Sequence, residues 1–155
     1  MRRALAGFLG LALASAFGAG DTTLKNRFND PFFRLSDEIA DCPEPRGPNI
    51  TEDEAIAQTH HRLERGLRCY LEKRCRYPSS YQYDPEIAAG IQAAVRGHRV
   101  ILPRSSLWIL VQGRRVYVQG CVPKDYRRGS LEKQLRQVPD VEVVTEELRI
   151  GSMAR

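Results

Sequence analysis

The feature that most constrains the fold of this chain is the pattern of its last third, residues 106–151. The apolar run Leu107–Val111 and the alternating run Val116–Val122 have the composition of strands, and the short glycine-containing segment between them is typical of a β-hairpin. A helical pattern over Asp125–Gln137 and an alternating strand pattern over Val141–Ile150 follow. This order predicts an α+β domain in which helices pack on a sheet.

A second predicted helix lies directly upstream, over residues 84–96. Asp84 is its expected cap, Pro85 suits the first helical turn, and Gly97 is a stop signal. Residues 21–48 lack such a pattern, and their recurrent prolines predict a linker with one short helical turn around Phe32–Ala40.

A long helix is predicted over residues 52–74. Thr51 and Glu54 have the spacing of a capping box, in which the hydroxyl and the carboxylate satisfy unpaired backbone amides. Downstream side chains recur at helical spacing and define one face: Ile56, His60, Leu63, Leu67, Tyr70 and Leu71. Together with its flanking segments, this helix forms an amino-terminal extension, residues 21–83.

Residues 84–151 resemble the BON domain, a small module common in exported bacterial proteins. The resemblance rests on the helix Pro85–Val95, on Val-x-Val-x-Gly-x-Val at 116–122, and on Val-x-x-Val-x-Glu-x-Leu-x-Ile at 141–150. It implies an α-β-β-α-β order, with a three-stranded mixed sheet carrying two helices on one face. It also implies a role in binding at a membrane surface or in maintaining the outer membrane.

The far face of that sheet is expected to be covered. Leu107–Val111 is apolar at every position, and continuous apolar runs are typical of strands buried on both faces. The only candidate for the cover is the helical extension, within Phe28–Tyr83. On the helix face, Gly120 is expected to let a helix approach the sheet closely, because a side chain there would hold it away.

The beginning of the chain has the features of a secretory signal peptide, residues 1–20. Arg2 and Arg3 precede an uncharged apolar stretch that ends in small residues. An uncleaved anchor is the alternative, but the stretch is short and weakly apolar for a membrane span. We therefore expect export, to the periplasm or beyond the cell, with no transmembrane span left after cleavage. Cleavage lowers the net charge from +5 to +3, because both arginines leave with the leader.

Four cysteines follow the leader: Cys42, Cys69, Cys75 and Cys121. An even number in an oxidising compartment predicts two disulfides, and the irregular spacing without a Cys-x-x-Cys pair argues against a metal site. In an unbroken helix, the Cα atoms of Cys69 and Cys75 lie about 9 Å apart, beyond the ~7 Å limit for a bridge. We therefore expect one of them to pair with Cys42 and the other with Cys121, unless the helix breaks between them.

The candidate binding residues are basic, with one tyrosine as an interfacial anchor. They are Arg114, Arg115, Lys124, Tyr126, Arg127, Arg128, Lys133 and Arg136. Each cation near an anionic phospholipid surface contributes at most ~1 kcal/mol, so several together predict weak, salt-sensitive binding. The alternative is an ordinary solvated helix face, since Asp125 and Glu132 dilute the charge.

A second functional hypothesis is an interaction subunit of an envelope or secretion assembly that docks through the extension. Phe28, Phe32 and Phe33 would then form either the docking surface or part of the cover of the sheet.

Catalysis, cofactors and metal ions are not expected. His60 and His61 are adjacent, so they diverge around a helix and cannot grip one metal together. Nucleophile-elbow, zinc-protease and phosphate-loop motifs are missing from the sequence. Nucleic acid is not an expected partner either, because the Gly-x-x-Gly clamp of KH modules is absent.

Overall fold

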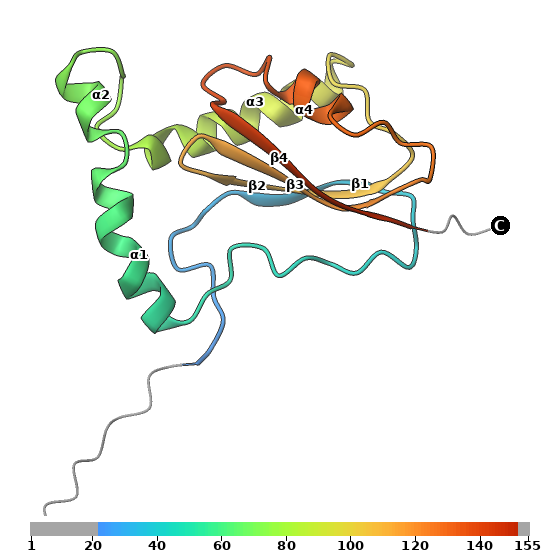
Figure 1. Ribbon diagram of the computed structural model, residues 1–155, viewed down its shortest axis with the longest axis horizontal. Coiled ribbons are helices and arrows are strands. Elements are labelled where there is room, and N and C mark those ends of the chain that lie inside the picture. Colours follow the sequence, from blue (N-terminus) through green and yellow to red (C-terminus); the bar gives the residue numbers. More distant parts are fainter. Residues whose placement is uncertain (1–21, 152–155) are drawn as a thin grey trace, which may run out of the picture.

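The computed structural model of the protein describes residues 22–151 (Figure 1). The predicted signal peptide, residues 1–20, lies outside them. The elements are β1 (Phe32–Asp37), α1 (Glu52–Glu64), α2 (Leu67–Leu71), the 3-10 helix η1 (Ser80–Tyr83), α3 (Asp84–Arg96), β2 (Ser106–Gln112), β3 (Arg115–Val122), α4 (Ser130–Leu135) and β4 (Val143–Ile150). The predicted α+β class is confirmed.

The sheet has four strands in the order β1-β2-β3-β4. β1 and β3 run antiparallel to β2, and β4 runs parallel to β3, so the sheet is mixed. The prediction of three strands is wrong at one edge, where residues 32–37 form β1 instead of a helical turn. Alternation explains the strand, because Phe33 and Leu35 pack against the core while Arg34 points to the other face.

Helices α3 and α4 lie on one face of the sheet (Figure 1). Alternate residues of β2 and β3 meet them in the core, whose most buried members are Ile87, Ile91, Leu107, Ile109, Val111, Val116, Val118, Val122, Leu131 and Leu135. The element order from α3 to β4 is the expected α-β-β-α-β. Helix α4 is shorter than the predicted 125–137, because residues 123–129 form turns.

The opposite face of the sheet is covered by an irregular segment, residues 38–50, which runs beneath it in Figure 1. Trp108 lies on this face and is only 4 % exposed. The Arg34 guanidinium stacks 4.7 Å from the centre of its ring, and Cys42 ties the segment to Cys121 of β3. The cover is therefore extended chain, and the expectation of a helical cover is wrong.

The predicted helix 52–74 is broken. It begins as expected, with the Thr51 hydroxyl accepting the Glu54 N–H at 3.2 Å and the Glu54 carboxylate accepting the Thr51 N–H at 2.8 Å. Gly66 then interrupts it with φ +100°, and a side chain there would lie 2.7 Å from the Ser80 nitrogen. Helices α1 and α2 and the turn up to Cys75 form a helical arm, residues 52–75, at one end of the sheet (Figure 1).

The prediction of two disulfides is confirmed, but the pairing expected for an unbroken helix does not occur, because the helix breaks between Cys69 and Cys75. The bridges join Cys42 to Cys121 and Cys69 to Cys75. Helix α2 ends at Leu71, and the chain turns back through Lys73, whose φ is +56°. This reversal brings the Cα atoms of Cys69 and Cys75 to 5.3 Å, within the range of a disulfide.

Two residues in the core have different roles from those predicted. Gly120 has φ +130°, and a Cβ there would lie 2.1 Å from the Ser106 carbonyl oxygen. The glycine is therefore required for β2 and β3 to pair closely, and not for the approach of a helix. Asp84 does not cap α3 from outside but is its first residue. Its buried carboxylate accepts the backbone N–H groups of Gly113 and Arg114 at 2.6 and 2.8 Å, which fixes the hairpin turn.

Candidate functional site

The predicted binding residues lie at the two ends of the sheet. Arg114 and Arg115 precede or begin β3, whereas Lys124–Arg128 follow its end. β3, which begins at Arg115 and is eight residues long, separates the two groups by about 25 Å at ~3.3 Å per residue. The structure therefore does not bring all the predicted cations into one site.

At the hairpin end, most of the positive charge is already paired. Arg114 donates to the Asp140 carbonyl at 2.9 Å and lies 2.8 Å from the Glu142 carboxylate. Arg136 pairs with Glu132 at 3.0 Å. Arg115 is exposed and has no ion pair with any described residue. Of the predicted cations at this end, only Arg115 is available within residues 22–151, while Arg114 holds the 136–142 loop in place.

At the other end, the cations are available. Lys124, Arg127, Arg128 and Lys133 are all exposed, and within residues 22–151 none of them forms an ion pair. They lie on the loop after β3 and on the exposed side of α4. Their charge is therefore free to meet an anionic partner.

Tyr126 lies in this loop but does not point out as an anchor. It is half-buried, its hydroxyl donates to Glu146 at 2.8 Å, and the same oxygen accepts the Leu131 N–H at 3.2 Å. Burial raises the pKa of Tyr126 to about 12. Tyr126 therefore holds the loop against β4 and α4.

Glu146 of β4 completes the support of this loop. Its carboxylate accepts the backbone N–H groups of Gly129 at 2.9 Å and Glu132 at 3.1 Å. These bonds satisfy amides at the start of α4 that have no partner within the helix. The sequence signal is a carboxylate on the helix side of β4, where Val144 and Leu148 are buried and apolar.

Ile101 lines the same hollow as Arg127 and Lys133 and was not predicted as a site residue. Its side chain is 73 % exposed, yet its backbone is fixed, because its N–H donates to the Gln134 side chain at 2.7 Å and its carbonyl accepts from it at 3.3 Å. A surface hollow separates residues 101–104 from α4 and the preceding loop. Arg104, also unpredicted, lines it and reaches Glu38 only at 3.8 Å.

We call this surface the basic patch and define it by its apolar centre and its cations: Ile101, Arg104, Lys124, Arg127 and Lys133. Asp125 is the one carboxylate that lines the hollow. The patch therefore has a net positive charge around an exposed apolar side chain. Arg128 borders it on the side of β4.

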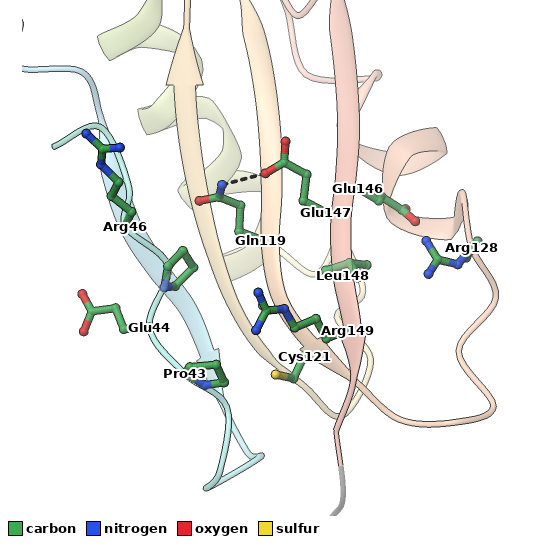
Figure 2. Close-up of a pocket in the computed structure, with 12 residues that line it drawn as sticks. Pro43, Glu44, Arg46, Gln119, Cys121, Arg128, Glu146, Glu147, Leu148 and Arg149 are labelled. Atoms are coloured by element: carbon green, nitrogen blue, oxygen red, sulfur yellow. Dashed lines mark hydrogen bonds between the residues drawn. The ribbon is translucent and has the colours of Figure 1, made fainter. Parts of the chain in front are cut away.

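A second hollow lies between residues 43–46 and strands β3 and β4 (Figure 2). Its lining charges are of both signs: Glu44, Arg46, Arg128, Glu146, Glu147 and Arg149. Glu147 accepts a hydrogen bond from Gln119 at 2.7 Å, as Figure 2 shows. Because its charges balance, this hollow attracts an anion less strongly than the basic patch does.

The three phenylalanines of the extension are half-buried. Phe33 packs against the core, Phe28 stacks 3.8 Å from the Arg62 guanidinium, and Phe32 lies over Gly47. Only Phe32 lies with the segment that covers the far face of the sheet, whereas Phe33 packs on the helix face and Phe28 packs on the arm.

Comparisons of the chain with models of protein families, with curated proteins and with solved structures found no match. Within residues 22–151, no three His, Cys, Asp or Glu side chains are placed to hold a metal ion together. No helix in this part of the chain is long and apolar enough to cross a membrane.

Proposed function

We propose that this protein is a non-catalytic, exported module whose basic patch binds an anionic phospholipid surface. The observation that carries the proposal is the exposed Ile101 side chain close to Arg127 and Lys133, which form no ion pair within residues 22–151. An exposed apolar side chain beside several cations suits a membrane interface, because the side chain enters the headgroup region while the cations contact the lipid phosphates. The resemblance of residues 84–151 to BON domains supports the same role.

The expected binding is weak and reversible. Each cation contributes at most about 1 kcal/mol, and burial of one isoleucine contributes about 2 kcal/mol. Because the cations are exposed, their share falls as salt is added. Export to the periplasm agrees with the two disulfides, which persist in oxidising compartments.

Vesicle co-sedimentation tests this proposal. We expect the protein to pellet with phosphatidylglycerol-containing vesicles and to stay in the supernatant with phosphatidylcholine vesicles. Arg127→Gln should weaken binding by about fivefold, the equivalent of about 1 kcal/mol, and Ile101→Ser by about thirtyfold, the equivalent of about 2 kcal/mol. Arg115→Gln is the matched control, because it removes an equally exposed cation from the far end of β3. Equal pelleting with both vesicles, or equal loss in Arg115→Gln and Arg127→Gln, contradicts the proposal.

The second candidate function is docking of a protein partner through the extension. The observation that favours it is the helical arm, whose apolar side chains face the solvent. This surface lies at the opposite end of the sheet from the basic patch (Figure 1).

A further inference from the structure

The predicted apolar face of residues 52–74 is not packed inward. Ile56, Leu63 and Leu71 are 68 %, 69 % and 70 % exposed, and Leu67 and Tyr70 are exposed as well. These five residues, which we call the arm stripe, supply five of the eight large apolar side chains that are exposed within residues 22–151. Exposed apolar side chains concentrated on two consecutive short helices favour an interaction site.

The arm stripe is held on a fixed support. Arg62 anchors α1 to the domain from between the rings of Phe28 and Tyr81, at 3.8 and 4.2 Å. Ile56 and Leu63 lie more than a quarter turn around the helix from Arg62 and stay exposed, although Leu63 also borders the hollow lined by Phe28 and Arg62. The Cys69–Cys75 bridge closes the far end of the arm. The stripe is therefore presented to a partner without prior folding.

The charges at the two ends of the arm are opposite. Glu52, Asp53 and Glu54 form the first turn of α1, where Glu54 pairs with Arg46 at 2.7 Å and Glu52 lies 3.8 Å from Arg27. Arg68, Lys73 and Arg74 lie in and after α2. Glu72 neutralises part of this basic end through ion pairs with Arg68 and Arg74. Neither Asp53 nor Lys73 has an ion pair with any residue of the described chain.

From these observations we infer that the arm stripe binds the arm stripe of a second copy of this chain, in an antiparallel arrangement. A two-fold axis places the acidic end of each arm against the basic end of the other, and it makes one surface complementary to itself. Leu63 is midway in sequence between Asp53 and Lys73, so it lies near the axis and packs on its own symmetry mate. This surface is separate from the basic patch, and the inference does not depend on membrane binding.

Sedimentation velocity of the protein, produced by export of the full-length sequence so that both disulfides form, tests the inference. We expect a monomer–dimer equilibrium that depends on protein concentration. Leu63→Glu should weaken the dimer at least about tenfold, as truncation of a central apolar contact does. Ile150→Glu is the matched control, since it puts the same charge on an exposed isoleucine away from the arm, and it should leave the equilibrium unchanged.

Charge reversal distinguishes the antiparallel arrangement from a parallel one. Asp53→Lys and Lys73→Asp should each weaken the dimer, and the two changes combined in one chain should restore it. In a parallel pair, like ends face each other, and a single reversal present in both copies again places like charges together, so it would not weaken association. The inference would be overturned by any of three results: a single reversal that does not weaken the dimer, a protein that stays monomeric at all concentrations, or equal effects of Leu63→Glu and Ile150→Glu.

Discussion

Arg62 of the helical arm donates to both carboxylate oxygens of Asp30, at 2.8 and 2.5 Å, across 32 residues of sequence. Both side chains are buried. Gln112 of β2 donates to the same carboxylate at 2.6 Å. This pair joins α1, the segment before β1 and the sheet, and it sets the position of the arm.

Breaking this pair should destabilise the protein strongly. Asp30→Ala leaves the Arg62 guanidinium buried without its counter-ion, and the expected loss is about 3–5 kcal/mol in the free energy of unfolding. Asp30→Asn combined with Arg62→Met removes both charges and should recover most of that loss. Urea denaturation, followed by Trp108 fluorescence, measures the free energy of unfolding of the single and the double variant. A double variant no more stable than Asp30→Ala would show that the charge pair is not the cause.

The two disulfides should contribute unequally. Cys42 and Cys121 are 79 residues apart, whereas Cys69 and Cys75 are 6 apart. The chain-entropy relation gives about 4.5 kcal/mol for the longer loop and about 2 kcal/mol for the shorter. Replacement of each pair by serine, followed by denaturant titration, should reproduce this order. Non-reducing peptide mapping that joins Cys121 to any cysteine other than Cys42 would contradict the fold.

Gly120 should tolerate no side chain. Gly120→Ala places a Cβ against the Ser106 carbonyl oxygen at a positive φ, and we expect a loss of at least about 2 kcal/mol. Gly129→Ala is the control, because Gly129 also has a positive φ but no atom lies within 4 Å of its added Cβ. Its cost should be limited to about 1 kcal/mol of backbone strain. Thermal unfolding of both variants should rank them accordingly.

Asp84 should make stability depend on pH. Desolvation raises its pKa from 3.8 to about 6, although the N–H groups of Arg114 and Gly113 oppose the shift. Because the folded state holds this proton more tightly than the unfolded chain, the contribution is fully present below about pH 4 and is lost as the pH rises through about 6. Between pH 7.5 and pH 5, the stability of the protein relative to Asp84→Asn should rise by about 1.4 kcal/mol. A constant difference across this range would refute the raised pKa.

Locally encoded elements could be predicted from the sequence. The hairpin, β3 and the helix from Asp84 each carry their own periodicity and turn or capping residues, and the structure has them close to the expected limits. The strand β1 was missed because its alternation is short and follows Pro31. Its identity comes from pairing with β2, more than 70 residues away, which no local pattern reveals.

In the helical arm, the apolar spacing in the sequence predicts neither the break in the helix nor the side that packs against the domain. Gly66 is a visible helix breaker, but the apolar spacing from Ile56 to Leu71 continues across it and predicts one helix. The side of α1 that packs against the domain is the side of Arg62, because Arg62 pairs with Asp30 and stacks between two aromatic rings. That side of α1 therefore packs, and the apolar side remains in solvent.

Of the basic patch, the sequence predicts only the cluster of positive charge. Lys124, Arg127 and Lys133 are recognisable as a basic cluster in sequence, but pairing of Arg114 and Arg136 depends on carboxylates brought in by the fold. Ile101 is a lone apolar residue in a loop, and no periodicity marks it as exposed.

Ile101 is the residue of the basic patch at which contact with an anionic membrane can be measured most directly. Ile101→Trp places a fluorophore at this position, while the buried Trp108 gives a constant background. We expect the emission of the variant to shift to the blue with phosphatidylglycerol vesicles, to stay unchanged with phosphatidylcholine vesicles, and to return toward its value in buffer as salt is added. An emission spectrum indifferent to anionic vesicles at low salt would contradict the account.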